Sequence, residues 1–375
     1  MIYYLNYIEI NRYFLLWLHN CLSSANQSFM TIQDKIQNIL IDFPPENGIL
    51  LDRLKELIAE PSLSETDDYT SRTILNCLEE TIDDSEGNSN ELIPTGWSNY
   101  DSQLGGLSLG EYVIVGGRPG MGKSLVLLDL ATRISLQTQV LYFSFDLTST
   151  ALMYRIANGF LERPIPLHNP ADFKRVNADD LKLLKSYFSA LHLSFYDRQI
   201  ESMTELFHYC EKMVREKGVK VIIIDYLQML SSKRYRNSRV LEVGYISRTL
   251  KKIALELKVC IIASSQLNRS VEMRGGDRRP VLTDIRESGG IEQDADKVFF
   301  VYRPEYYGLL IDEYNESTLS MMELILAKNR FGSTTTLKFN VDFAKSKLAP
   351  FEEGKSRFQI RKDRKLNLDE EDNPF

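Results

Sequence analysis

The chain has 375 residues, of which 43% are hydrophobic and 26% are charged, and its formal net charge is −7. These proportions are typical of a soluble globular protein with one large domain and a smaller one, or with two domains. The acidic balance excludes a surface that is basic throughout, although it is compatible with a local basic groove. The four cysteines are scattered without a C-x-x-C pair, which argues against a disulfide framework or a zinc site and favours a reducing, cytoplasmic location.

Residues 1–29 are interpreted as an apolar N-terminal extension. Its longest unbroken apolar run, residues 13–18, is too short to span a bilayer. Glu9 and Arg12 interrupt the stretch and no basic segment precedes it, so neither membrane insertion nor a signal peptide is expected. Three interpretations stay open: a helix that packs on a partner, a helix at a membrane surface, and an extension upstream of a start at Met30. The third is slightly favoured, because a regular helical pattern begins at Met30.

Residues 30–90 are predicted to form a small helical region that ends in a linker. Ile32, Ile36 and Ile39 fall on one face of a first helix, and similar apolar stripes follow around residues 50–58 and 71–82. Helices this short are marginal alone, so their apolar faces are expected to dock on the main domain or on another subunit. The acidic and polar residues 83–90 are typical of a solvated linker.

The main domain is predicted over residues 91–350, and residues 351–375 are predicted to be a charged, disordered tail. Apolar runs with strand character alternate with helical stretches, which predicts an α/β fold with a mostly parallel central sheet flanked by helices. The predicted strands are residues 112–116, 139–145, 193–196, 219–225, 259–264, 297–302, 322–328 and 334–340. The last two lie close together in the sequence and are predicted to form an antiparallel hairpin.

A glycine-rich loop between the first predicted strand and an apolar-faced helix fits G-x-x-x-x-G-K-[ST] at every fixed position. Its glycines let backbone N–H groups surround phosphate oxygens, and the helix N-terminus adds partial positive charge. Lys123 is predicted to reach the β- and γ-phosphates of ATP, and Ser124 to ligate Mg²⁺. The predicted nucleotide-binding residues are Gly117, Arg118, Pro119, Gly120, Met121, Gly122, Lys123 and Ser124.

An acidic residue, Asp225, follows the four apolar residues 221–224. A buried strand that ends in an acid is the Walker B arrangement, and open α/β sheets bind their ligands at the carboxyl ends of the strands. Asp225 is therefore predicted to hold a water of the Mg²⁺ shell. Capping of a following helix is the alternative for an aspartate in this position.

Four further segments resemble the signature motifs of DnaB-type replicative helicases. They are Asp-Tyr-Leu-Gln at 225–228, Ser-Ser-Gln-Leu-Asn-Arg-Ser at 264–270, Arg-Glu-Ser-Gly-Gly-Ile-Glu-Gln-Asp-Ala-Asp at 286–296, and Leu-Ala-Lys-Asn-Arg-Phe-Gly at 326–332. The glycine-rich loop and Pro94-Thr95-Gly96 fit the same family, so the resemblance covers residues 93–350. It implies a RecA-like P-loop ATPase core, a hexameric ring and ATP-driven translocation on single-stranded DNA in the 5′→3′ direction.

The resemblance also implies roles for individual residues. Gln266 would sense the γ-phosphate by a hydrogen bond. Lys328 and Arg330 would reach the nucleotide of a neighbouring subunit and stabilise transition-state charge. Such a contact is head-to-tail and closes into a ring when the rotation allows. The helix over residues 71–82 resembles the family's linker helix, which docks on the adjacent subunit.

Two segments are expected to contact single-stranded DNA. The first is a basic, glycine-containing segment at 269–280, predicted to be a mobile loop that carries Arg269, Arg274, Arg278 and Arg279. The second is residues 284–290, where a guanidinium would pair with a phosphate oxygen and glycines would allow a close backbone approach. The predicted DNA-binding residues are Arg269, Arg274, Arg286, Glu287 and Gly289. A further basic stretch is either a DNA contact or a solvated loop, and contains Lys233, Arg234, Arg236 and Arg239.

Asp146 departs from the family pattern, which has at this position a glutamate that polarises the attacking water. Aspartate is one methylene shorter, and a misplacement of about 1 Å can cost about two orders of magnitude in rate. The sequence therefore predicts slow ATP hydrolysis with Asp146 as the base. The region over residues 30–90 is also shorter than the family's N-terminal domain. This difference argues against the usual primase coupling and favours a divergent member, from a mobile element or an accessory system.

The last seven residues, 369–375, are acidic and end in Pro-Phe. They resemble the partner-docking tip of bacterial single-strand DNA-binding proteins, so docking to other replication proteins is an alternative to a purely solvated tail.

Three functions stay open from the sequence. The first is an ATP-dependent DNA helicase that forms a homo-oligomeric ring. The second is a RecA-like ATPase ring that does not unwind DNA, against which the motifs at 264–270 and 286–289 weigh. The third is a weakly hydrolysing nucleotide-binding scaffold that binds DNA or another helicase, which the aspartate at 146 favours.

Overall fold

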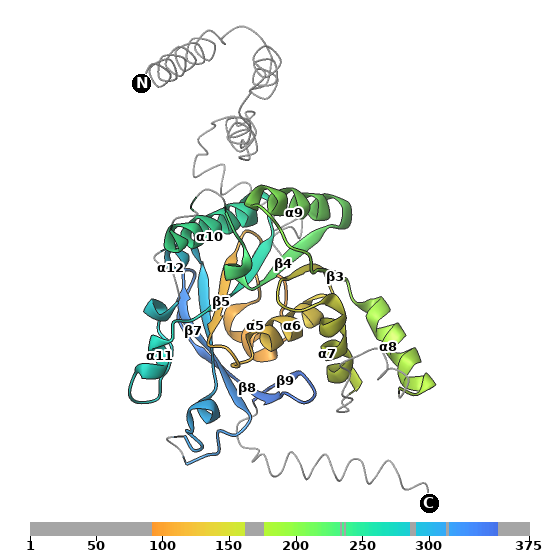
Figure 1. The fold of residues 1–375 in the computed structure, drawn as a ribbon. Coiled ribbons are helices and arrows are strands. Elements are labelled where there is room, and N and C mark those ends of the chain that lie inside the picture. Colours follow the sequence, from red (N-terminus) through yellow and green to blue (C-terminus); the bar gives the residue numbers. More distant parts are fainter. Residues whose placement is uncertain are drawn as a thin grey trace, which may run out of the picture. The chain divides into compact units, whose positions relative to one another are not determined.

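The computed structural model describes residues 92–161, 176–232, 235, 238–285, 290–312 and 315–351. The predictions for the N-terminal extension, the helical region, the linker and the C-terminal tail lie outside these described residues, as do those for Arg286, Glu287 and Gly289. The described part of the chain is built on a nine-stranded sheet in the order β3-β2-β4-β5-β1-β6-β7-β8-β9 (Figure 1).

The strands confirm the predicted α/β class. They are β1 (Tyr112–Gly117), β2 (Gln139–Ser144), β3 (Leu193–Tyr196), β4 (Val219–Asp225), β5 (Cys260–Gln266), β6 (Lys297–Tyr302), β7 (Met321–Asn329), β8 (Thr336–Asp342) and β9 (Lys347–Pro350). The first six pair in parallel, and β6, β7, β8 and β9 pair in antiparallel fashion. The predicted hairpin is therefore confirmed as β7–β8. Strand β9 was missed, because its four residues carry no alternating pattern.

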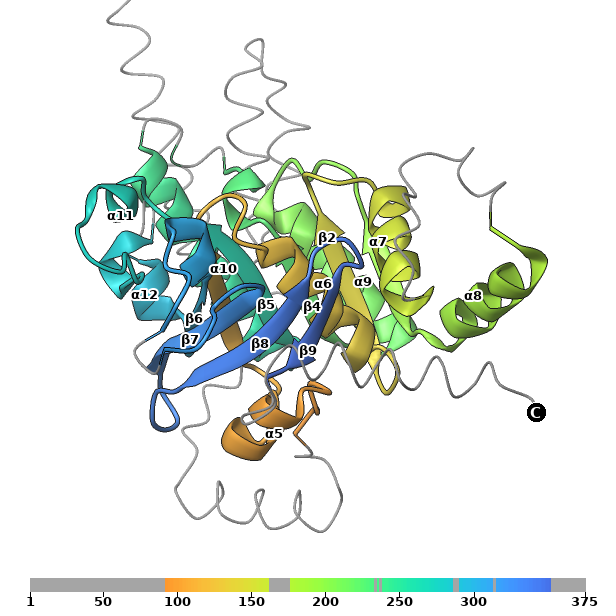
Figure 2. The same cartoon turned by 90° about the horizontal axis from the view of Figure 1, so that it is seen from below.

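Helices cover both faces of the sheet. They are α5 (Ser98–Leu104), α6 (Lys123–Ile134), α7 (Ser149–Leu161), α8 (Ala178–Ala190), α9 (Met203–Lys217), α10 (Arg239–Glu256), α11 (Ser270–Met273) and α12 (Ile291–Asp294), with 3₁₀ turns η2 (Leu227–Met229), η4 (Leu282–Asp284) and η5 (Pro304–Tyr307). Seen from below, β7, β8 and β9 extend the sheet, while α11 and α12 lie on the opposite side from α8 (Figure 2). No described helix has the length and apolarity that a membrane crossing requires.

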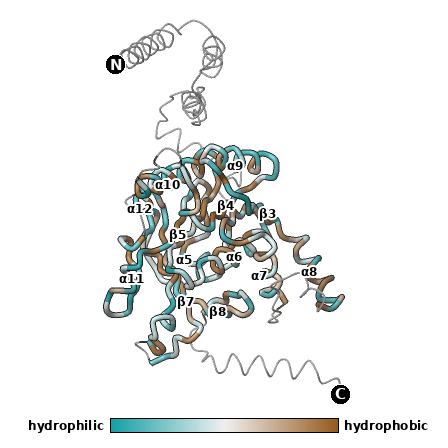
Figure 3. The backbone as a smooth tube through the Cα atoms, viewed as in Figure 1, coloured by the Kyte–Doolittle hydropathy of each residue, from teal (hydrophilic) through white to brown (hydrophobic). Residues whose placement is uncertain are grey.

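The central strands are buried on both faces, as expected for parallel strands that are covered by helices. Along β1, Val113 and Val115 pack in one core with α6, whereas Tyr112 and Ile114 pack in a second core with α10. Hydrophobic residues accordingly follow the strands, and the chain around α11 is hydrophilic (Figure 3). This two-sided burial holds β1 in place and fixes the position at which the glycine-rich loop begins.

An ion pair is buried where β1 and β6 begin. Lys297 Nζ lies 2.7 Å from Glu111 Oε1, and the two residues are 4% and 2% exposed. The second carboxylate oxygen of Glu111 accepts a hydrogen bond of 2.9 Å from the backbone N–H of Ser108. Removing one member of such a pair leaves the other charge buried without compensation.

The change Glu111→Gln is expected to lower the free energy of unfolding by about 3–5 kcal/mol, because it leaves the Lys297 ammonium unpaired. The double variant Glu111→Gln/Lys297→Met should recover part of this loss, since it removes both charges. Chemical denaturation measures the free energy of unfolding of the single and the double variant. Asp342→Asn, which removes an exposed carboxylate 4.0 Å from Lys345, is the control and should leave the midpoint close to that of the wild type. A wild-type midpoint for Glu111→Gln would contradict the expectation.

Candidate nucleotide-binding site

The glycine-rich loop runs from the end of β1 to the first residue of α6. Gly120 and Gly122 have φ angles of +79° and +101°, in the left-handed region that favours glycine. A Cβ atom on Gly122 would also lie 2.7 Å from Cε of Met322. Strand β1 is flanked by β5 and β6, and the loop therefore turns at the carboxyl edge of the parallel strands, with the N-terminus of α6 at the same edge.

The loop borders a cavity of about 690 Å³ that is lined by most of the residues predicted to bind or hydrolyse the nucleotide. Its lining includes Pro119, Gly120, Gly122, Lys123 and Ser124 from the loop, together with Asp146, Asp225 and Gln266. Gly117, Arg118 and Met121 do not line it. Met121 is buried in the core at 1% exposure, and the side chain of Arg118 extends to Leu267 and Glu272. The predicted phosphate contacts of these three residues therefore stay a prediction from the motif.

Lys123 lines the cavity and is hydrogen-bonded to the loop itself. Its ammonium donates hydrogen bonds to the carbonyl oxygens of Gly117 at 2.9 Å and Arg118 at 3.2 Å. Burial lowers the pKa of Lys123 to about 8; the Asp225 carboxylate opposes this shift and the Arg118 guanidinium adds to it. A phosphate would reverse the shift, because it replaces two neutral carbonyls with negative charge beside the ammonium.

The carboxylate of Asp225 is held from both neighbouring strands. Ser264 on β5 donates a hydrogen bond of 2.5 Å to Oδ1, and the Tyr142 hydroxyl on β2 donates one of 3.2 Å to Oδ2. Burial, and secondarily Asp225 itself, raises the pKa of Tyr142, so the hydroxyl stays a donor. Asp225 lines the cavity with Ser124, and the two supply the oxygen ligands that Mg²⁺ prefers.

Gln266 lies directly beside the loop, because the parallel pairing of β1 and β5 places it opposite Gly117. Its backbone N–H donates to Gln228 Oε1 at 3.2 Å, and Gln228 Nε2 donates to Ser265 Oγ at 2.9 Å. Gln228 belongs to the Asp-Tyr-Leu-Gln motif. It therefore holds the end of β5, which carries Gln266 of the motif at 264–270. Asp146 follows β2, is exposed and lines the same cavity.

Sequence reasoning missed one wall of the cavity, which α7 forms. Tyr154, Arg155 and Asn158 line it together with Ala151. Their spacing of i, i+3, i+4 and i+7 marks one helical face, and a polar stripe on an otherwise apolar helix was the available signal. Asn158 is 8% exposed, and its buried Oδ1 has no hydrogen-bond partner among the described residues.

A second missed contribution comes from the turn between β8 and β9. Phe343 lines the cavity and is 42% exposed. The guanidinium of Arg303 lies 4.1 Å from the centroid of the Phe343 ring, and its Nη1 donates to the Gly120 carbonyl at 3.2 Å. An aromatic face is thereby fixed beside the glycine-rich loop.

Lys328 and Arg330 do not line this cavity. The antiparallel pairing of Asn329 with Lys297 places them at the beginning of β6, whereas the loop follows the end of β1. With about 3.3 Å per residue, the six residues of β1 separate these edges by roughly 20 Å. Lys328 Nζ donates to the carbonyls of Glu292 at 2.5 Å and Ala295 at 2.8 Å.

The basic segment at 269–280 is tied down more than its composition predicts. Arg274 pairs with the buried Asp284 at 2.6 Å, and Arg279 pairs with the buried Glu323 at 2.5 Å. Arg269, at the start of α11, is exposed. The expectation of a mobile loop therefore requires correction at Arg274 and Arg279, whose guanidinium groups attach the segment to buried acids.

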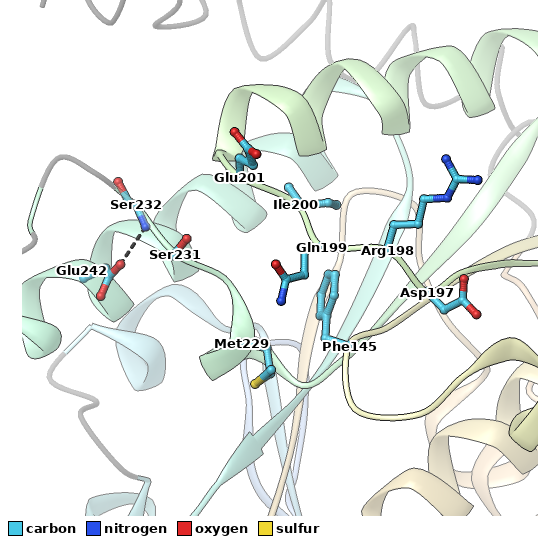
Figure 4. Close-up of a pocket in the computed structure, with 10 residues that line it drawn as sticks. All are labelled: Phe145, Asp197, Arg198, Gln199, Ile200, Glu201, Met229, Ser231, Ser232 and Glu242. Atoms are coloured by element: carbon cyan, nitrogen blue, oxygen red, sulfur yellow. Dashed lines mark hydrogen bonds between the residues drawn. The ribbon is translucent and has the colours of Figure 1, made fainter. Parts of the chain in front are cut away.

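A second cavity, of about 450 Å³, lies beside Phe145 and the start of α9 (Figure 4). Its carboxylate Glu242 accepts hydrogen bonds from the Ser232 N–H and from Arg239 Nη1, both at 2.7 Å. Arg239 of the second basic stretch is thus engaged within the fold, and Lys233, Arg234 and Arg236 lie outside the described residues. We assign this cavity no ligand.

A glycine-rich loop after a central parallel strand, sharing a cavity with an acid at the end of the next strand but one in the sheet, defines a P-loop nucleotide-binding protein. Residues 93–352 match the family described as "DnaB-like helicase C terminal domain". The chain belongs to this DnaB-like helicase family, which confirms the resemblance drawn from its motifs.

Relatives support the same assignment. The chain is 35% identical over 303 residues to the replicative DNA helicase DnaB of Geobacillus stearothermophilus, covering 78% of this chain and 65% of the relative. It is 33% identical over 252 residues to a probable plasmid replicative DNA helicase of Chlamydia psittaci, covering 66% of this chain and 54% of the relative. The matched part thus spans between about half and two thirds of the length of these relatives.

Solved structures confirm the fold. One of them, an isolated ATPase domain, aligns with a TM-score of 0.67 and 28% identity over 76% of this chain and 100% of that one. A DnaB-like replicative helicase, solved in a study of its interactions with primase, aligns with a TM-score of 0.65 and 28% identity. The alignment covers 85% of this chain and 75% of that one.

Nucleotide affinity is expected to be flat below pH 8 and to weaken above it by up to about tenfold per pH unit. The free protein loses the Lys123 proton near pH 8, whereas bound phosphate raises the pKa and holds that proton. Binding of a fluorescent ATP analogue, titrated between pH 6.5 and 9.5, measures this dependence. Lys123→Met should bind more weakly and without this pH dependence. Wild-type affinity that stays constant to pH 9.5 would count against the prediction.

Proposed function

We propose that the chain is an ATP-dependent DNA helicase of the DnaB type. It assembles into a hexameric ring, translocates on single-stranded DNA in the 5′→3′ direction and unwinds duplex DNA. The observation that carries the proposal is the separation of the nucleotide cavity from Lys328 and Arg330 by the length of β1. One chain holds only part of the site, so a neighbouring copy completes it.

Within one chain, the backbone N–H groups of the loop and the Lys123 ammonium bind the phosphates. Gln266 contacts the γ-phosphate, and Asp146 polarises the attacking water. Ser124 and Asp225 would hold Mg²⁺, which when bound neutralises charge on the β- and γ-phosphate oxygens. The turn at Phe343 offers an aromatic face on which the base stacks, at the cavity wall next to the loop.

The α7 face supplies two further groups. Arg155 adds a second cation to the wall of the same cavity, where it offsets phosphate charge, and Asn158 offers an amide whose oxygen is unsatisfied among the described residues. Arg155→Ala is therefore expected to weaken nucleotide binding or slow hydrolysis, although the residue lies outside the loop.

Lys328 and Arg330 act on the nucleotide of the neighbouring copy. A contact in which one surface meets a different surface of the next copy is heterologous, and such contacts close into a ring when the rotation between copies allows it. DNA lies on the basic segment at 269–280, where Arg269 is exposed, and on residues 286–289, which are assigned by family resemblance. Contacts to the phosphate backbone predict binding that tolerates any sequence and weakens with salt.

The decisive experiment measures ATP hydrolysis with and without single-stranded DNA on protein sized by light scattering, and then unwinding of a forked duplex. We expect a ring, stimulation by DNA and unwinding. A ring that hydrolyses ATP without unwinding would favour the RecA-like motor, and ATP binding without DNA-stimulated hydrolysis would favour the scaffold.

A mixing experiment tests whether Arg330 acts in trans. Lys123→Ala and Arg330→Ala rings should each be inactive. Mixed subunits should regain activity, because about a quarter of the interfaces then combine an intact Lys123 with an intact Arg330. Hydrolysis is measured after denaturation and co-refolding, with Lys123→Ala/Arg330→Ala mixed with Lys123→Ala as the inactive control. No recovery in rings of proven mixed composition would contradict action in trans.

The aspartate at 146 is expected to limit turnover. Asp146→Glu should raise the hydrolysis rate by about tenfold or more, because the longer side chain brings the carboxylate closer to the attacking water. Asp146→Asn should abolish hydrolysis while the affinity for ATP changes little. Single-turnover measurements with bound ATP separate the two effects. Full activity of Asp146→Asn would exclude Asp146 as the base.

A further inference from the structure

Arg118 belongs to the glycine-rich loop, yet its side chain extends away from the nucleotide cavity. Nη1 donates to the Leu267 carbonyl at 2.9 Å, and Nε donates to Glu272 Oε1 at 2.9 Å. Nη2 lies 2.9 Å from the same carboxylate oxygen, and the side chain is only 9% exposed. The planar guanidinium thus spans a backbone carbonyl and a carboxylate at once, which a lysine ammonium cannot do with the same geometry.

The two groups that receive Arg118 belong to one continuous piece of chain. Leu267 directly follows Gln266 at the end of β5, and Glu272 lies on α11 within the basic segment at 269–280. Leu267 also pairs with Ile285, and the N–H of Asn268 donates to the Asp284 carbonyl at 2.8 Å. The Arg118 side chain therefore touches the end of the strand that carries Gln266 and the start of the segment expected to meet DNA.

The basic segment is attached to neighbouring elements at several points. Arg274 bridges to the Asp284 carboxylate at 2.6 Å, and the Tyr302 hydroxyl donates to the Asp277 carbonyl at 2.5 Å. At its α11 end, the Arg118–Glu272 pair joins this segment to the glycine-rich loop. The glycine-rich loop is thus linked to an ordered piece of chain that is itself held against η4 and β6.

The backbone of Arg118 contacts Lys123, which lines the nucleotide cavity. Its carbonyl accepts the Lys123 ammonium at 3.2 Å, and a bound phosphate competes for that same ammonium. A single residue therefore has its main chain in the phosphate-binding arrangement and its side chain on α11. The other charged side chain of the loop, Lys123, turns back onto the loop's own carbonyls.

We infer that the Arg118–Glu272 ion pair couples the nucleotide loop to the basic segment at 269–280, and that Glu272 is a positioning residue for DNA-stimulated ATP hydrolysis. The inference rests on the proposed function, since it requires a motor that responds to single-stranded DNA. DNA bound at the segment shifts α11, and the ion pair carries that shift to Arg118 and so to the carbonyl that shares the Lys123 ammonium.

The test compares Glu272→Gln with Met273→Gln, a change at the neighbouring, 87% exposed position on the same helix. Hydrolysis without DNA, hydrolysis with saturating single-stranded DNA, the KM for ATP and DNA affinity by anisotropy are measured for each. We expect Glu272→Gln to keep the DNA-free rate and the DNA affinity within about twofold, while the stimulation ratio falls about fivefold or more. Met273→Gln should resemble the wild type in all four.

A double-mutant cycle sharpens the result. Arg118→Lys keeps the charge but cannot make both contacts, so it should lower the stimulation ratio as well. Arg118→Lys/Glu272→Gln should then be no worse than Arg118→Lys alone, because both changes break the same contact.

Each other outcome overturns the inference. If the wild type is stimulated by DNA and Glu272→Gln retains the full ratio, the coupling role fails and the proposed function stands. An equal loss of DNA-free and DNA-stimulated rates, or fully additive effects in the cycle, would assign the pair a purely structural role. A wild type that DNA does not stimulate would overturn the proposed function and, with it, this inference.

Discussion

The pairing of β1 between β5 and β6 is the constraint on which the site depends. It sets Gly117 opposite Gln266 at one edge of the sheet, and it sets Val113 opposite Lys297 near the other edge. The register therefore decides which side chains share a cavity with the loop and which do not. Burial of β1 on both faces makes a shift of this register costly, since one step would exchange its two packed faces.

Much of the site could be predicted because its residues stand at strand ends. Asp225 and Gln266 end strands whose apolar runs are visible in the sequence, and Lys123 and Asp146 follow such strands. Parallel strands bring their carboxyl ends together, which places these residues in one cavity. Phe343 was not predicted as a residue of the site. Its contribution depends on a turn between β8 and β9, and β9 lies at the edge of the sheet with no alternating pattern of its own.

The direction in which a side chain points could also not be predicted from the sequence. The motif places Arg118 in the loop but leaves open whether its guanidinium faces phosphate or protein, and the carboxylate that receives it is 154 positions away. The same limit applies to Arg274 and Arg279, whose acceptors are buried acids on η4 and β7. A cluster of basic residues in a sequence therefore overstates the charge that is available to DNA, because pairing is decided by tertiary contacts.

The carboxylate of Asp296, 1% exposed, joins the two halves of the proposed site within one chain. It accepts the N–H of Tyr112 at 2.8 Å and the Lys251 ammonium at 2.6 Å, and it lies 3.3 Å from Arg330 Nη1. Tyr112 begins the strand that ends at the glycine-rich loop. Strand β1 thus begins beside Asp296, the carboxylate that pairs with Arg330, and ends at the glycine-rich loop. The bond between Tyr112 and Asp296 therefore places the Arg330 contact and the glycine-rich loop at opposite ends of β1 within the same chain.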